Sequence, residues 1–146
     1  MPTYSSPAIS NANPYRAHGE SGMVQTAVAT ITCTAAPATT DPLQFFYLPA
    51  NSRVVGGWLS ASDMDTNASP TIALNIGDSG SASRYFAAST VAQAGTAATA
   101  LAVGGLGYLN TAKTLVTGVA SNNAATGAAG TVTLCLQYVV EDSATS

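Results

Sequence analysis

Charged side chains are scarce in this 146-residue sequence, which has four Lys and Arg, seven Asp and Glu and one His, for a net charge of −3. They make up 8% of the residues, whereas about 25% is usual in a soluble domain. Four scattered cations cannot neutralise a run of phosphates, so the sequence excludes a nucleic-acid partner. Wholesale disorder is excluded too, because it requires low hydrophobicity and the hydrophobic residues here reach 47%.

Long apolar runs are also missing. Thr, Ser, Asn, Gly or Pro interrupts every apolar run well before the roughly 18 residues that a transmembrane helix requires. We therefore expect no membrane partner. The first residues do not combine a positively charged segment with an apolar one, so we also expect no secretory signal.

Cysteine and histidine are equally rare. Cys33 and Cys135 are too few for a disulfide framework, and we expect them to be reduced and buried. They lie in the first and last strands expected below, which often pair in a sandwich and would make the two thiols neighbours. The sole histidine, His18, cannot complete the four ligands of a structural zinc site with them.

The sequence shows no set of residues that is typical of a catalytic site. A catalytic triad needs an imidazole fixed in a pocket, whereas His18 lies in a Pro- and Gly-rich segment. The Gly-rich run at residues 103–108 has no following Lys or helix, so it does not indicate a phosphate-binding loop. Glycines that allow close backbone approach in a strand are the better interpretation. We expect no enzymatic activity and no cofactor.

The few charges are unevenly distributed. Between Tyr85 and Val140 the only charged side chain is Lys113. A free monomer usually covers its surface with mixed charges, whereas the cores of permanent interfaces are depleted in charge. The pattern therefore indicates a subunit of an assembly. The alternative is a small neutral Ala- and Thr-rich surface without a partner.

Residues 1–22 differ from the rest of the chain. They contain three prolines among Asn, Ser and Gly, with almost no alternating apolar pattern, and predict an extended N-terminal arm. Tyr4, Ile9 and Tyr15 are spaced along it and are candidates to anchor the arm on a neighbouring subunit. A plain disordered terminus is the alternative.

From residue 23 onward the sequence is typical of short β-strands. Residues 24–33 and 131–140 alternate with period two and are rich in β-branched side chains. Further strands are expected at residues 43–48, 52–60, 71–76, 84–87, 101–109 and 113–119. The pair Gly56 and Gly57 predicts a bulge or bend.

One short helical turn is expected among the strands. It covers residues 89–94, with Ser89 as its N-cap and Gly95 as its left-handed stop.

Seven to nine short strands with turn signals between them predict an all-β fold, an antiparallel β-sandwich of jelly-roll-like type. We expect this domain to cover residues 23–142, after the extended arm at residues 1–22. A short flexible tail follows at residues 143–146.

The segment from residue 63 to residue 67 presents oxygen ligands at alternate positions. The glycine and glutamate that complete an EF-hand are replaced by Ala68 and Leu74, so a calcium loop of that type is excluded. Asp63, Asp65 and Asp78 remain weak candidates for a different calcium site. The favoured interpretation is that they are Asx-turn residues in loops between strands.

Aromatic residues cluster in the expected strands. Adjacent residues of a regular strand point to opposite faces, so Phe45 and Phe46 are expected to place one ring in the core and one outside. An outward ring can stack on sugars or anchor a subunit interface, although core packing accounts for most of the aromatic residues.

The segments VVGGWLSASDMDT, LNIGD, RYFAASTVAQAG and TVTLCLQYVVED follow one another along the chain. Together they resemble small virion structural proteins of tailed bacteriophages, and the resemblance covers about residues 43–142. It implies a non-enzymatic virion subunit, of the capsid decoration or cement type. Head decoration proteins of this size are commonly small β-rich oligomers, often trimers, set at junctions between major capsid proteins.

The resemblance also implies the partners and the location. The partners are the major capsid protein and further copies of this chain, with a trimer favoured, and the location is the capsid surface of the virion after synthesis in the host cytoplasm. Two alternatives stay open. One is a phage tail or baseplate subunit. The other is a glycan-binding β-sandwich module that uses exposed aromatic residues and calcium.

Overall fold

The structure is a computed structural model that describes residues 23–141. The predicted arm at residues 1–22 and the predicted tail at residues 143–146 lie outside the described residues. Within residues 23–141 no helix is long and apolar enough to cross a membrane.

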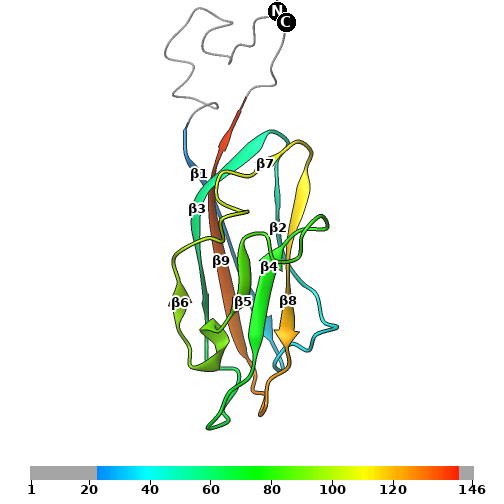
Figure 1. The fold of residues 1–146 in the computed structure, drawn as a ribbon, viewed down its shortest axis with the longest axis vertical. Coiled ribbons are helices and arrows are strands. Elements are labelled where there is room, and N and C mark those ends of the chain that lie inside the picture. The colour runs from blue at the N-terminus through cyan, green and yellow to red at the C-terminus, as the bar shows by residue number, and fades with distance from the viewer. Residues whose placement is uncertain (1–22, 142–146) are drawn as a thin grey trace, which may run out of the picture.

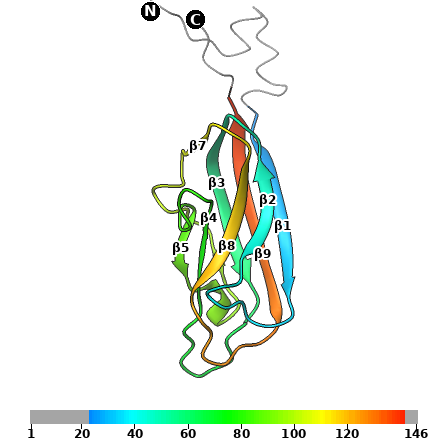
Figure 2. The same ribbon diagram turned by 90° about the vertical axis from the view of Figure 1, so that its right-hand side faces the viewer.

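The described chain is an all-β sandwich of two antiparallel sheets, as the sequence predicts (Figures 1 and 2). One sheet has five strands in the order β1-β9-β3-β6, with β7 also paired to β3, and the other has four in the order β2-β8-β4-β5. The elements are β1 (Gln25–Cys33), β2 (Leu43–Leu48), β3 (Ser52–Ala61), β4 (Ala73–Gly77), β5 (Phe86–Ser89), the 3-10 helix η2 (Val91–Gln93), β6 (Ala97–Ala98), β7 (Leu109–Asn110), β8 (Thr114–Asn122) and β9 (Gly130–Val140).

The strand pairing is that of a long hairpin wrapped into two layers. The first half of the chain pairs with the second in reverse order: β1 with β9, β2 with β8, β3 with β6 and β4 with β5. Wrapping this hairpin then places β3 beside β9 and β4 beside β8. Eight strands joined in this way form a jelly roll, so the structure also has the predicted topology.

The two alternating segments become the paired strands β1 and β9. Along β1 the burial alternates strictly, with Ala27, Ala29 and Ile31 turned inward and the intervening threonines and Val28 exposed. In β9 the inward residues are Val132, Leu134 and Leu136, all fully buried.

The sandwich is filled by side chains from both sheets. The largest fully buried side chains are those of Leu48, Val54, Leu59, Met64, Ile72, Leu74, Ile76, Tyr85, Val116, Val132, Leu134 and Leu136. Burial of this apolar set is the main favourable term in folding.

Three local predictions about strands and turns are wrong. Residues 101–109 were expected to form a strand, but only Leu109 belongs to one, and the segment before it turns back on itself through bonds from Gly105 N and Leu106 N to Ala102 O. A glycine at φ +82°, Gly107, follows this turn and departs from strand geometry.

The helical turn is shorter than predicted. It is the 3-10 helix η2, and Thr90 rather than Ser89 stands at its N-cap, without a capping side-chain bond. The predicted left-handed glycine is correct, because Gly95 has φ +71°.

Strand β2 departs from regular alternation. Its pairing with β8 shifts register between Gln44 and Phe46. As a result Phe45 is buried and Phe46 also packs against the core, while Tyr47 is exposed. The expectation that Phe45 and Phe46 point to opposite faces is therefore wrong, because the irregular register turns both rings toward the core.

The predicted irregularity at the paired glycines is present in β3. The register against β9 shifts between Val54 and Gly56. A Cβ atom on Gly57 would overlap the backbone oxygen of Cys135 and lie 2.9 Å from Leu136 Cδ2. The close contact between β3 and β9 therefore requires glycine at position 57.

We expect Gly57→Ala to lower the free energy of unfolding by about 2 kcal/mol or more, because the added methyl group must displace the backbone of β9. Chemical denaturation measures this change. Gly104→Ala is the matched control, since a Cβ there has no neighbour within 4 Å, and we expect it to change stability by less than about 0.5 kcal/mol. Equal stability of the two variants would contradict the packing argument.

Candidate functional site

Three Asx turns follow one another in the loop between β3 and β4. Asp63 Oδ1 accepts a bond from Asp65 N at 3.1 Å, and Asp65 Oδ1 accepts one from Asn67 N at 3.4 Å. Asn67 Oδ1 in turn accepts from Ser69 N at 2.9 Å. The alternating oxygens noted in the sequence are used in these turns, which is the interpretation that the sequence favoured.

Asp65 also joins this loop to the loop between β8 and β9. Its buried carboxylate accepts bonds from the backbone nitrogens of Thr71 at 2.7 Å and Ile72 at 3.2 Å, close in sequence. Two more come from the β8–β9 loop, from Ala125 N at 2.9 Å and Thr126 N at 2.9 Å. One side chain therefore satisfies backbone donors from both loops.

The pKa of Asp65 reflects two opposing effects. Burial raises the pKa, but the bonds from the backbone N–H groups of Thr126, Ala125, Thr71 and Ile72 together lower it well below the ordinary value of an aspartate. Asp65 is therefore a charged structural group at neutral pH.

Asp78 is held in the turn between β4 and β5. Its carboxylate accepts two bonds from Arg84, at 2.7 Å from Nε and 3.2 Å from Nη2, and bonds from Gly80 N and Ser81 N. Burial raises the pKa of Asp78, but these bonds outweigh burial and lower it. The Arg84 guanidinium also stacks on Tyr108, 3.6 Å from the ring centre.

The three calcium candidates are thus not brought together as ligands. Asp63 and Asp65 lie in one loop and Asp78 in another, with its carboxylate on Arg84. No group of three or more His, Cys, Asp or Glu side chains within residues 23–141 is arranged to hold a metal ion.

The two cysteines are free and buried, as expected, but they are not neighbours. Strands β1 and β9 do pair, yet Cys33 lies opposite Gly130 and Cys135 lies opposite Val28. Cys33 faces the core and Cys135 the other side of the sheet, between Val28 and Trp58. Burial raises the pKa of both thiols, which keeps them protonated and unreactive.

Charged side chains of the described residues lie at the two ends of the sandwich. We call one the terminal end, where β1 begins and β9 ends, and the other the loop end, where the β3–β4 and β8–β9 loops lie (Figure 1). The terminal end has Arg53, Asp78, Arg84, Lys113 and Glu141, and the loop end has Asp41, Asp63 and Asp65.

The long faces between the two ends are free of charge over residues 23–141. Across the outer face of the β1–β9–β3 sheet, Val28, Cys135 and Trp58 form one cross-strand row, and Val28 and Trp58 are exposed. The neighbouring rows consist of Thr, Ser, Gln and Gly. The few charged side chains of the described residues therefore lie at the two ends of the sandwich, and its long faces are neutral.

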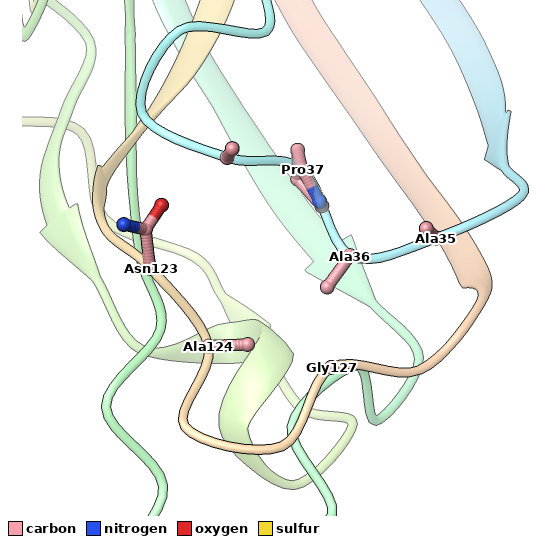
Figure 3. A pocket seen from close by; sticks show the side chains of 7 residues that line it. Ala35, Ala36, Pro37, Asn123, Ala124 and Gly127 are labelled. Carbon is pink, nitrogen blue, oxygen red and sulfur yellow. The ribbon is translucent and has the colours of Figure 1, made fainter.

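A pocket of about 310 Å³ lies at the loop end (Figure 3). It is bounded by residues 35–38 on one side and by Asn123, Ala124 and Gly127 on the other. A bond of 3.0 Å from Thr39 N to Asn123 Oδ1 fixes the two walls together. Its lining is mostly methyl and methylene groups, which suit an apolar side chain better than a polar small molecule.

The interface candidates Tyr4, Ile9 and Tyr15 lie outside the described residues, as does His18. The described chain begins at the terminal end beside the end of β9, where Gln25 pairs with Tyr138. The sequence predicts a neutral surface in the stretch before Val140, but it does not predict the neutral outer face of β1 and β3. Alternating Thr and Val residues are the sequence signal that could have indicated this face.

The fold and these surfaces define a class: a jelly-roll β-sandwich with charged ends and long neutral faces. Comparison with solved structures finds a chain in the cyanophage Pam1 capsid asymmetric unit, 41% identical, with TM-score 0.74, over 84% of this chain and 89% of that one. A chain in the capsid of Ralstonia phage GP4 is 32% identical, with TM-score 0.75, over 84% of this chain and 88% of that one. This chain therefore belongs to a family of phage capsid proteins and is a virion structural protein.

A third structure shares the fold alone. The acid-stable capsid of Helicobacter pylori bacteriophage KHP30 contains a chain that is 15% identical, with TM-score 0.54, over 80% of this chain and 94% of that one. No family model and no curated protein matches the sequence. The predicted resemblance to phage virion proteins is confirmed by the first two structures.

Because folding lowers the pKa of Asp65 and Asp78, the unfolded chain binds more protons than the folded one in acid. Their contribution to stability is complete above the ordinary carboxyl pKa of about 4 and is lost as the pH falls through the lowered values. We expect urea midpoints to hold from about pH 7 to about pH 5 and to fall below about pH 4. A midpoint unchanged down to about pH 2 would contradict this linkage.

Asp65→Asn tests the carboxylate itself. It replaces one acceptor oxygen by an NH₂ group that faces backbone N–H donors, so we expect Tm to fall by on the order of 10 °C and the acid dependence to shrink. Asp63→Asn is the control, because Asp63 accepts the backbone bond from Asp65 N through an oxygen that asparagine retains. We expect it to lower Tm by only about 2 °C or less.

Proposed function

We propose that this protein is a non-enzymatic decoration or cement protein, which binds the outside of the phage head and stabilises contacts between major capsid proteins. The observation that carries the proposal is the extensive match to a chain in the cyanophage Pam1 capsid asymmetric unit. Its partners in this role are the major capsid protein and further copies of itself, in a trimer. Its location is the capsid surface after synthesis in the host cytoplasm.

The compact fold supports an added subunit. A wrapped hairpin of eight strands pairs its own backbone, so the sandwich can fold before it attaches to a shell. The neutral faces provide protein contact surface, because interface cores are depleted in charge. Each copy needs only modest contacts, since repetition around a symmetric shell multiplies them into high avidity.

The arm at residues 1–22 is proposed to reach an adjoining subunit. The described chain enters the sandwich at the terminal end, where Gln25 pairs with Tyr138 of the last strand. Tyr4, Ile9 and Tyr15 would supply the apolar anchors, and an extended segment can add to an open sheet edge through its backbone.

We expect deletion of residues 1–20 to leave the sandwich folded and to weaken attachment to capsids by about tenfold or more, because the anchors are lost while the core is kept. Capsids that lack the protein are incubated with full-length or truncated chain, and occupancy and heat resistance are measured. A triple variant with Tyr4, Ile9 and Tyr15 changed to Ser separates loss of the anchors from loss of chain length. Full occupancy and full heat resistance with the truncated chain would refute the role of the arm.

The location is tested by labelling the C-terminus and imaging whole virions by negative stain. We expect label over the head surface at regular positions, because a cement protein binds where capsid subunits meet. Label on the tail or baseplate would overturn the proposed location. Label-free virions of the same phage provide the control for background.

A further inference from the structure

One long side of the sandwich is built from residues 86–108, which include β5, η2 and β6; we call it the β5–β6 side (Figures 1 and 2). It contains no charged residue. Its exposed residues are small or apolar: Ala87, Ala88, Thr90, Ala94, Gly95, Thr96, Ala97, Thr99, Ala100, Val103, Gly104, Leu106 and Gly107. This side is more apolar than the Thr-rich outer face of the β1–β9–β3 sheet.

Val103 and Leu106 form an apolar knob on this side. Val103 is 94% exposed and Leu106 is 56% exposed. Covering such side chains is favourable, at about 25 cal/mol for each Å² of apolar surface removed from water.

The turn that carries the knob is held firmly on the sandwich. Ala102 N donates to Tyr85 O at 2.8 Å, and Gly107 N donates to Val54 O at 2.7 Å. Arg53 Nη1 donates to Gly107 O at 2.8 Å. The knob is therefore presented in a fixed position, which lowers the entropic cost of binding.

A groove of about 240 Å³ lies beside the knob, and every residue that lines it except Ser89 has an apolar side chain. Phe86, Ala87 and Ser89 of β5 line one wall. Ala98, Ala100, Leu101 and Ala102 line the other and lead straight into the knob. The same side of one chain thus presents both a projecting apolar group and a recess lined mainly by small apolar side chains.

Strand addition does not suit this side. Both β5 and β6 are edge strands, but β6 has only two residues and the β5 register is shifted against β4. Ala88 in β5 has φ +48°, and its N–H is bonded to Asn75 Oδ1 at 2.7 Å. Short and irregular edges resist backbone pairing. Contact here must be made by side chains.

From the adjoining knob and groove we infer that the β5–β6 side binds a second copy of this chain, with Val103 and Leu106 of one copy in the groove of the next. A second copy brings both parts to the contact, because its groove can receive the knob and its knob can enter the groove. Residues 86–108 add no charge to this contact; Arg53 borders the turn at Gly107, but its guanidinium is paired with Glu141.

Such a contact pairs two different patches, and it is made twice, reciprocally, in a two-fold dimer or once at each interface in a head-to-tail ring. A head-to-tail contact produces a closed ring when its rotation closes. The knob adjoins the groove, so both patches can face a common axis. This inference rests on the proposed function in assuming that the protein works as an oligomer, but it is tested on isolated full-length protein.

The first experiment compares wild type with a Val103→Ser, Leu106→Ser variant by sedimentation velocity over a concentration series. We expect wild type to associate and the variant to show a dissociation constant raised by about tenfold or more. Both side chains are exposed, so unchanged thermal melting shows that the fold is intact. Val28→Ser is the matched control, since Val28 is exposed on the other face, and we expect it to associate like wild type.

A charge swap tests the pairing of the knob with the groove. Ala87→Glu in the groove and Val103→Lys on the knob should each weaken association, because each buries an unpaired charge. The double variant places Lys of one copy against Glu of the next, and we expect it to associate at least about tenfold more tightly than either single variant. Ala87→Lys, Val103→Lys is the control, and we expect it to stay dissociated.

Three results would overturn the inference: a monomeric wild type, a Val103→Ser, Leu106→Ser variant that associates like wild type, or loss of association with Val28→Ser instead. Capsid binding of the same proteins is measured separately. Association through this side without capsid binding would refute the cement role alone, whereas capsid binding by a monomeric wild type would refute this inference alone.

Discussion

The fold depends on the backbone pairing of the last strand, β9, with both the first and the third strand. β9 lies between β1 and β3 along nearly its whole length, so one sheet is not complete until the end of the described chain is in place. On one face β9 supplies Val132, Leu134 and Leu136 to the core, and on the other it places Cys135 between Val28 and Trp58. Gly57 is required for the same reason, because β3 must approach β9 more closely than a side chain allows.

The ends of the sandwich meet a different physical requirement. Loops leave backbone donors without strand partners, and buried donors must be satisfied. At the loop end the Asp65 carboxylate accepts bonds from two loops, and at the terminal end Asp78 and Arg84 secure the β4–β5 turn. Most of the few charges of the described chain therefore have structural partners, and they leave the long faces neutral.

Neutral faces are well suited to an assembly of identical copies. A capsid protein meets the same surfaces many times, and the cores of permanent interfaces are depleted in charge. Small side chains on the β5–β6 side allow close approach, while the fixed turn at Val103 and Leu106 adds a specific contact. The same chemistry explains why a scarcity of charge does not leave the fold unstable: the core is apolar, and the charges that remain stabilise loops.

Much of the molecule follows from the sequence alone. Period-two alternation at residues 24–33 and 131–140 determines two strands and their inward faces, because successive side chains of a strand must point to opposite sides. Turn signals determine the number of short strands and hence the sandwich, and the scarcity of charge indicates an assembly. The tertiary structure decided the rest. It turned both Phe45 and Phe46 toward the core, separated the two cysteines onto opposite faces, and converted residues 101–108 from an expected strand into an exposed turn. Each of these depends on register and on contacts between segments distant in the chain, which local patterns do not specify.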